Sequence, residues 1–146
     1  MILADAQATH EAGRTFAPQL RAGDVIALSG DLGAGKSTFA RGLLEGLGFK
    51  GDVPSPSFAL VIPYAPPALR LPVWHVDLYR IEATEEVEEL GLDDVLDEGA
   101  LVIEWPELLG GRLWPEALRL RLEPHGAGRL LTARVPPSWG ARCPPI

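Results

Sequence analysis

The sequence predicts an α/β fold with a mostly parallel central sheet that carries antiparallel additions. Short, nearly continuous apolar runs recur along the chain, and such runs are typical of strands buried on both faces of a parallel sheet. Between two of these runs lies a segment whose apolar residues Phe39, Leu43, Leu44 and Leu47 repeat at helical spacing. Strands that alternate with helices in this way predict that helices pack on the sheet.

The first helix is expected over residues 9–20, with Thr9 as its cap, and Pro18 is expected to shorten or kink it. The second helix is expected over residues 37–47, where Gly48 is a plausible stop. The expected strands are short, and they lie at residues 25–29, 58–62, 73–78, 100–103, 118–122 and 130–135.

The rest of the chain gives weaker signals. The acidic stretch 82–98 predicts two short helices that are broken near Gly91. With 146 residues, the chain has the length of one domain. We expect that domain to cover residues 1–136, and we expect the proline-rich tail 137–146 to be poorly ordered.

Composition narrows the classes of partner and location. Thirteen Lys and Arg residues face twenty Asp and Glu residues, so the formal net charge is −7. A negative chain with scattered arginines is repelled at long range by a nucleic-acid backbone. The single cysteine, Cys143, excludes an internal disulfide and a cysteine-rich metal site. No apolar run reaches the roughly 18 residues that span a bilayer and no secretory signal is readable, so the cytoplasm is the expected location.

Residues 30–37 match the pattern G-x-x-x-x-G-K-[ST], and they join an expected strand to an expected helix. Glycines let a backbone fold around phosphates with its N–H groups turned inward, and the start of the helix adds its positive dipole end. Lys36 brings an ammonium group to the β- and γ-phosphates, and the Ser37 hydroxyl can ligate Mg²⁺. The sequence therefore predicts the three-layer fold of a P-loop nucleoside-triphosphatase. The residues of this loop expected to bind the nucleotide are Asp31, Gly33, Ala34, Gly35, Lys36, Ser37 and Thr38.

Two acidic residues close expected strands. Asp77 and Glu104 each follow an apolar run, and ligands of open α/β sheets sit at the carboxyl ends of strands. One carboxylate should hold Mg²⁺ and the other could orient the attacking water, and the pattern leaves open which does which. His75 lies two residues before Asp77, on the same strand face, where we expect it to pack or hydrogen-bond inside the fold.

The segment Ser55-Pro56-Ser57-Phe58 separates the loop helix from the next strand. Its hydroxyls and rigid proline suit a switch that closes on the γ-phosphate, although an ordinary turn has the same composition.

Four motifs occur together in one order along the chain: residues 30–38, residues 55–58, His75-Val76-Asp77-Leu78-Tyr79-Arg80 and Glu104-Trp105-Pro106-Glu107. Together they resemble the bacterial TsaE family, also called YjeE, the ATPase component of tRNA threonylcarbamoyladenosine biosynthesis. The resemblance covers about residues 5 to 135. Ser37 and Ser57 stand where threonine is commoner in the family, which keeps both hydroxyls.

The resemblance implies roles for individual residues. Lys36 and the loop backbone would bind the phosphates of ATP, and Ser37 and Glu104 would hold Mg²⁺. Asp77 would take the catalytic role, with Glu104 and Lys36 beside it. Trp105 would lie near the nucleotide, and the helix near Thr9 would approach the adenine. The implied partners are a TsaD-type transferase subunit and a TsaB-type subunit, through which the chain would act on tRNA only indirectly and without a membrane.

Two other classes remain open at this point. A small kinase would need an acceptor pocket and usually a lid with arginines, and residues 48–104 contain only Arg70 and Arg80. A GTP-dependent switch would usually carry an N-K-x-D motif, and the chain contains no asparagine. Both classes therefore fit less well than an ATPase that works with partner proteins.

Overall fold

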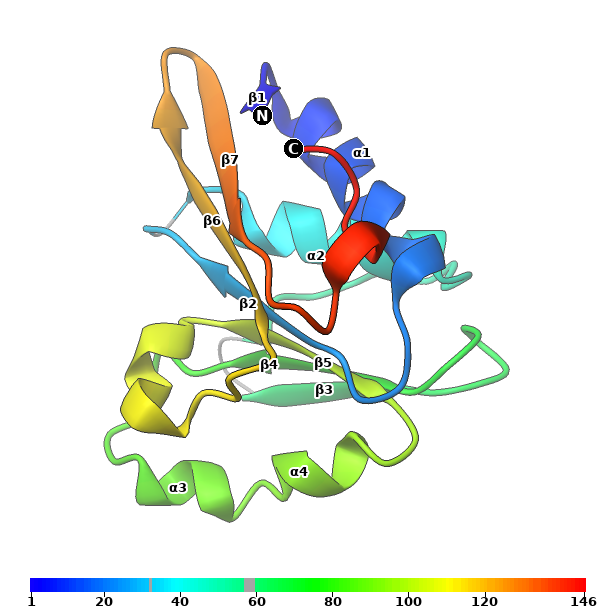
Figure 1. Cartoon of the computed structure of the whole chain (residues 1–146), viewed down its shortest axis with the longest axis vertical. Coiled ribbons are helices and arrows are strands. Elements are labelled where there is room, and N and C mark those ends of the chain that lie inside the picture. The colour runs from blue at the N-terminus through cyan, green and yellow to red at the C-terminus, as the bar shows by residue number, and fades with distance from the viewer. Residues whose placement is uncertain (32, 57–59) are drawn as a thin grey trace.

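A computed structural model describes residues 1–31, 33–56 and 60–146, and it shows a seven-stranded sheet between helices (Figure 1). The strand order is β1-β7-β6-β2-β5-β4-β3. The four inner strands β6, β2, β5 and β4 are parallel, and antiparallel strands flank them on both sides. The predicted α/β fold with a mostly parallel centre is therefore confirmed. The strands are β1 (Ile2–Leu3), β2 (Val25–Ser29), β3 (Val61–Tyr64), β4 (Val73–Asp77), β5 (Ala100–Glu104), β6 (Leu118–His125) and β7 (Gly128–Arg134).

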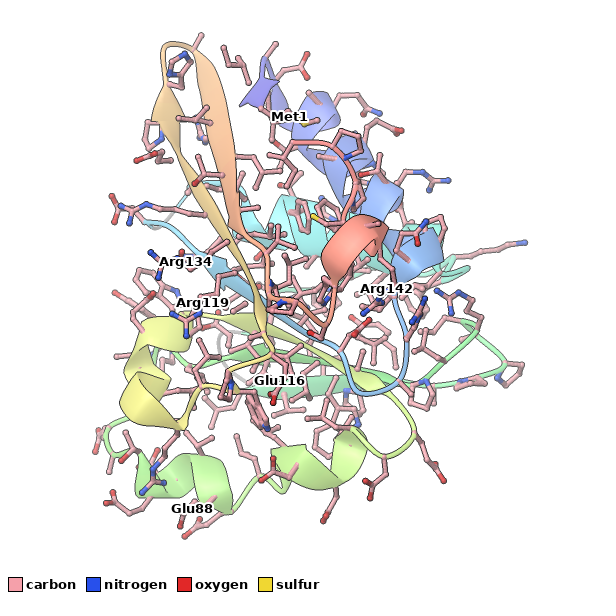
Figure 2. The ribbon with its side chains drawn as sticks, viewed as in Figure 1. Met1, Glu88, Glu116, Arg119, Arg134 and Arg142 are labelled. Atoms are coloured by element: carbon pink, nitrogen blue, oxygen red, sulfur yellow. The ribbon has the colours of Figure 1, made fainter. Side chains whose placement is uncertain are left out.

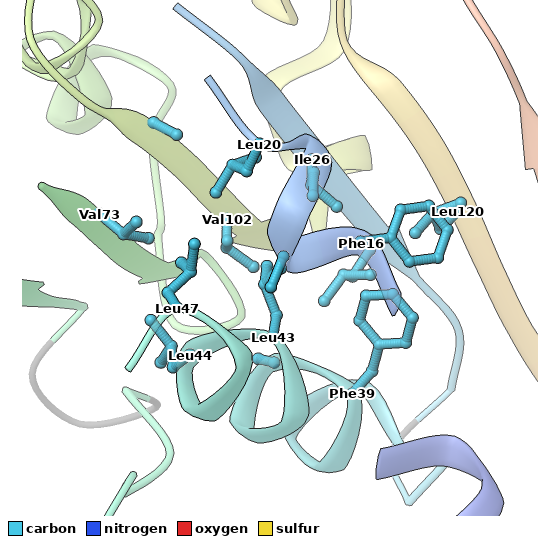
Figure 3. Packing of buried hydrophobic residues seen from close by; sticks show 14 of the residues in the cluster. Phe16, Leu20, Ile26, Phe39, Leu43, Leu44, Leu47, Val73, Val102 and Leu120 are labelled. Atoms are coloured by element: carbon cyan, nitrogen blue, oxygen red, sulfur yellow. The ribbon is translucent and has the colours of Figure 1, made fainter. Parts of the chain in front are cut away.

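The helices form two layers on opposite faces of the sheet. They are α1 (Ala6–Phe16), α2 (Lys36–Gly46), α3 (Glu85–Glu88) and α4 (Leu92–Val95), with 3₁₀ turns η1 (Ala17–Gln19), η2 (Pro106–Arg112) and η3 (Gly140–Arg142). Side chains of β2 alternate between the layers: Ile26 and Leu28 belong to the α1–α2 core, whereas Val25 and Ala27 belong to the core on the α3–α4 side. The sheet is thus covered on both faces, and Figure 3 shows the first core around Phe16, Phe39 and Leu43.

Two glycines allow α1 and α2 to cross closely. A Cβ atom built on Gly42 would lie 1.9 Å from the carbonyl oxygen of His10, and one on Gly13 would lie 2.1 Å from that of Phe39. Contacts this short exclude any side chain at either position. The crossing holds the N-terminal half of α1 beside the start of α2, which is where the phosphate loop ends.

The start of α1 corrects one expectation. The helix begins at Ala6, and Asp5 is its cap, because its side-chain Oδ1 accepts a hydrogen bond from the Ala8 N–H at 2.8 Å. The prediction of Thr9 as the cap was wrong, since Asp5 has the extended backbone that a cap requires. The expected break at Pro18 is present: α1 ends at Phe16, and Pro18 lies in η1.

Other boundaries shift by a few residues. The strand expected at 58–62 is observed as β3, and residues 57–59 lie outside the described part of the chain. The last two strands are longer than expected and form the β6–β7 hairpin. The two short helices α3 and α4 flank Gly91 as predicted. The sequence did not indicate the two-residue β1 or the turn η2.

The tail that the sequence predicts to be poorly ordered packs against the body of the protein. Trp139 is buried, and its ring lies edge-on to Phe16 with centroids 6.4 Å apart. Arg142 donates to both carboxylate oxygens of Asp24, at 2.9 and 3.0 Å. The buried Trp139 ring and a bidentate ion pair therefore hold this segment near α1 (Figure 1).

Among the helices in the described ranges, none combines the length and the apolar character needed to cross a bilayer.

Candidate nucleotide-binding site

The phosphate loop joins β2 to α2, as the sequence predicts. Three of its glycines have positive φ angles: 143° at Gly30, 78° at Gly33 and 103° at Gly35. L-residues rarely adopt these angles, so glycine is required for the path of the loop. A Cβ atom on Gly30 would also lie 2.3 Å from the carbonyl oxygen of Leu122, which shows how closely the loop packs on β6.

A cavity of about 240 Å³ opens in front of the loop. The segments that line it are far apart in sequence, because the carboxyl ends of the parallel strands β2, β4 and β5 meet at one edge of the sheet. Its lining residues are Gly33, Ala34, Gly35, Lys36, Ser37, Thr38, Ser55, Asp77, Glu104 and Trp105. Most of the residues predicted for the site therefore share one cavity. Asp31 and Thr9 do not line it.

Lys36 is the cation of the cavity, and it is only 5% exposed. Its Nζ donates to the carbonyl oxygen of Gly30 and lies 3.7 Å from the centroid of the Trp105 ring. Burial lowers the pKa of Lys36 from its ordinary value of 10.5, and the negative charges of Glu104, Glu107, Asp77 and Asp31 oppose this effect. The ammonium group is thus held in a partly desolvated position where a phosphate would be a favourable partner.

Glu104 connects the loop to β4. The Ser37 hydroxyl lies 3.4 Å from each carboxylate oxygen of Glu104, and His75 donates from Nε2 to Glu104 Oε2 at 2.6 Å. Glu104 is 3% exposed and His75 is completely buried. The histidine therefore fixes one oxygen of a buried carboxylate while the carboxylate faces the loop hydroxyl.

Asp77 faces the same cavity from the neighbouring strand. It is the register partner of Glu104, and its Oδ1 accepts a hydrogen bond from the Tyr79 N–H at 2.9 Å. That bond orients the carboxylate at the end of β4. The two predicted carboxylates therefore lie side by side at the mouth of the loop.

Trp105 takes a left-handed backbone conformation, with φ at 61°. Such a conformation is uncommon for a bulky residue and indicates a locally constrained backbone. The ring packs against Tyr79 with centroids 5.0 Å apart, and its face lies under Lys36. Trp105 thus closes the side of the cavity that faces η2.

A second cavity of about 230 Å³ lies on the other side of the loop. It contains Thr9, which is buried and close enough that a Cβ atom on Gly35 would lie 3.3 Å from Thr9 Cγ2. Gly33, Gly35 and Thr38 line both cavities, so the two spaces meet at the loop. The second cavity is lined by Asp5, Ala6, Thr9, Gly33, Gly35, Thr38, Ala127, Gly128 and Arg129.

No pattern in the sequence pointed to Arg129. Its guanidinium donates to the carbonyl oxygens of Gly33 at 2.8 Å and Ala34 at 3.0 Å, and also to that of Gly128 at 2.9 Å. An arginine about 95 positions from the loop carries no local signal, because only the β6–β7 hairpin brings it there. The role of His75 as the partner of Glu104 was also missed, although its place on the same strand face as Asp77 was recognised.

The donors in the first cavity fit Mg²⁺. A serine hydroxyl and a carboxylate are hard oxygen ligands, and Mg²⁺ commonly takes one or two protein carboxylates together with substrate phosphates and water. Within residues 1–31, 33–56 and 60–146, no group of three or more His, Cys, Asp or Glu side chains is arranged to hold a metal by itself.

Comparison with known proteins identifies the family. A model of the family described as "Threonylcarbamoyl adenosine biosynthesis protein TsaE" matches residues 3–131. The chain belongs to the TsaE family. A TsaE protein of Streptomyces coelicolor is 45% identical over 114 residues, which cover 77% of each chain. The TsaE of Mycobacterium tuberculosis is 37% identical over 137 residues, covering 88% of this chain and 79% of the relative.

The TsaE of Bacillus subtilis is 42% identical over 105 residues, or 71% of this chain and 64% of the relative. The crystal structure of YdiB from the same organism superposes with a TM-score of 0.80 at 29% identity, covering 97% of this chain and 88% of YdiB. The three TsaE relatives are named for tRNA threonylcarbamoyladenosine biosynthesis. The TsaE family and the P-loop-like fold together indicate a nucleotide-binding protein of that pathway.

Proposed function

We propose that the chain binds ATP together with Mg²⁺ and hydrolyses it, and that its nucleotide state controls association with the transferase subunits of the pathway. One observation carries the proposal: the phosphate loop, the buried Lys36 and two strand-end carboxylates share one cavity. Each group matches a need of phosphoryl transfer, which depends on positioning and on stabilising negative charge.

In this proposal the loop amides and Lys36 bind the β- and γ-phosphates. Bound Mg²⁺ would supply positive charge that neutralises part of the charge on the phosphates. Ser37 and Glu104 would hold the ion, supported by the 3.4 Å approach of the Ser37 hydroxyl to both Glu104 oxygens. His75 would keep Glu104 in that orientation, which is a positioning role.

We assign to Asp77 the orientation of the attacking water, because it lines the cavity beside Glu104 at the end of the neighbouring strand. The second cavity is the space proposed for the sugar and adenine, with Thr9 and Thr38 on its wall. Asp31 would act through the loop backbone and its charge. The proposed switch, residues 55–58, contributes Ser55 to the first cavity, and its Ser57 and Phe58 lie outside the described residues.

The proposed partners are a TsaD-type transferase subunit and a TsaB-type subunit, with tRNA reached only through them. The assay is reconstitution of threonylcarbamoyladenosine formation on unmodified tRNA from the purified subunits. We expect repeated turnover only when this chain and ATP are both present, and co-elution with the subunits in ATP but not in ADP.

The variant Lys36→Met serves as the matched negative control, because it keeps an unbranched side chain of similar length and removes its charge. Two results would contradict the proposal. One is modification of tRNA that is undiminished when the chain is omitted, and the other is co-elution of wild type and Lys36→Met with the subunits regardless of the nucleotide.

A further inference from the structure

The β6–β7 hairpin brings together arginines that the sequence scatters. Arg119 of β6 lies directly opposite Arg134 of β7, and Arg121 lies two residues further along β6, opposite Thr132. Residues at i and i+2 of a strand, and their register partners, share one face of the sheet. Leu118, Leu120 and Leu122 fill the α1–α2 core on the other face, so the three arginines face away from those helices. Figure 2 shows Arg119 and Arg134 next to each other beside β6.

All three arginine side chains are exposed on this face of the hairpin. Arg121 lies 3.8 Å from Glu123, and Glu107 lines a cavity with Arg119 between β6 and η2. The guanidinium groups of Arg119 and Arg134 have neither an ion pair nor a hydrogen bond within the described residues. We name the surface formed by Arg119, Arg121 and Arg134 the arginine face.

This arrangement is unfavourable for the isolated protein, because like charges directly opposite each other destabilise an antiparallel pair. It also contrasts with the rest of the molecule. Residues 118–134 carry four arginines and one glutamate, a net charge of +3 in a chain of −7. An uncompensated pair of cations on an exposed part of the sheet indicates that the compensating charge comes from another molecule.

We propose that the arginine face binds a carboxylate-rich extended segment on a protein partner. Side chains at alternate positions of an extended segment lie about 7 Å apart, which is also the spacing from Arg119 to Arg121 along β6. Each guanidinium group can bind a carboxylate through a bidentate contact. A short segment would fit within the face, whereas a long polyanion such as tRNA would also meet the nine acidic residues between positions 82 and 98.

The location gives this contact a consequence for the nucleotide site. Arg121 is the register partner of Ser29, the last residue before the phosphate loop, and Arg129 of the same hairpin holds two loop carbonyls. A partner bound on the arginine face therefore sits on the element that contacts the loop. The inference rests on the proposed function only for the identity of the partner, the transferase subunits.

The test compares two double variants that change the net charge equally. Arg119→Glu with Arg134→Glu reverses the arginine face, and Arg41→Glu with Lys50→Glu reverses two exposed cations elsewhere. The first probe is a labelled peptide in which glutamate alternates with threonine, and its binding is measured by fluorescence anisotropy. The second is the purified transferase complex with ATP. We expect the face variant to bind both probes about tenfold more weakly or worse, and the control variant to stay within about twofold of wild type.

The outcomes separate this inference from the proposed function. Peptide binding that is lost only in the face variant, without binding to the complex, supports the arginine face and contradicts the proposed partner. If both variants still bind the complex, the result supports the proposed function and overturns the inference. Failure of wild type to bind either probe also overturns the inference. Unmodified tRNA is titrated in parallel. Tighter binding of tRNA than of peptide, lost in the face variant, overturns the protein-partner assignment in favour of RNA. Retained ADP affinity verifies that each variant is folded.

Discussion

The contact of Arg129 with the phosphate loop gives a prediction about nucleotide affinity. Arg129→Met keeps an unbranched apolar stem and removes the donors to Gly33, Ala34 and Gly128. Without the guanidinium donors, water hydrogen-bonds to the loop carbonyls and the loop is less ordered. Nucleotide binding must then also order the loop, which lowers the affinity. We therefore expect weaker binding of Mg·ADP and Mg·ATP with the fold preserved.

The magnitude follows from the two loop contacts. A hydrogen bond that involves a charged group contributes about 1.5–3 kcal/mol, and leaving a buried partner without a hydrogen bond costs about 1–3 kcal/mol. Arg129 is only half-buried and water can replace part of each bond, so we expect a net loss of about 1–3 kcal/mol. That loss corresponds to roughly 5- to 150-fold weaker nucleotide binding.

Isothermal titration calorimetry with Mg·ADP measures the loss directly. Arg129→Lys should fall between wild type and Arg129→Met, because a lysine keeps the charge without the two-pronged geometry. Arg41→Met changes an exposed arginine on α2 that lines neither cavity, so it is the matched control and should bind normally. If folded Arg129→Met binds Mg·ADP within about twofold of wild type, the loop does not depend on this arginine.

Three further predictions concern the cavity. Lys36→Met should abolish ATP hydrolysis, yet it should raise the free energy of unfolding of the nucleotide-free protein by about 0.5–2 kcal/mol at pH 7, because it removes a buried charge. Burial lowers the pKa of Lys36 in the folded protein below 10.5, so the unfolded state binds more protons at pH values between the folded and unfolded pKa. Wild type is therefore stabilised as pH rises through that window, and the stability gain of the variant in thermal melts should shrink there. Near-wild-type turnover would remove Lys36 from the mechanism. Asp77→Asn and Glu104→Gln should each lose hydrolysis, but only Glu104→Gln should need more Mg²⁺ in a titration of ATPase activity or nucleotide binding; equal half-saturation points in all three proteins would show that Glu104 does not hold the ion. Trp105 emission should change on nucleotide addition, because its ring contacts Lys36 and borders the cavity, and a signal that persists in Trp105→Phe would come from another of the four tryptophans.

The parts of the site that the sequence predicted are those with local causes. The phosphate loop is encoded in eight consecutive residues, because its glycines, lysine and hydroxyl act through the backbone path that they themselves allow. Asp77 and Glu104 were found because a parallel strand delivers its last residue to a common edge. The cap of α1 was misassigned to Thr9, because Asp5, Gln7 and Thr9 are all polar residues near the start of that helix, and the backbone angles of Asp5 and its hydrogen bond from Ala8 decide between them.

The sequence by itself determined the fold class, the loop chemistry and the acidic strand ends, because these depend on short-range periodicity and backbone conformation. Tertiary structure alone decided the rest. His75 meets Glu104, Arg129 meets the loop, and Arg119 meets Arg134 only once strands from distant parts of the chain are in register. The order of the C-terminal tail was also decided by tertiary structure. Its proline-rich composition predicts disorder, but a buried tryptophan and an ion pair with Asp24 hold it against the protein. Contacts of this kind depend on the order of the strands in the sheet, which places segments from distant parts of the chain side by side and cannot be read from any one segment.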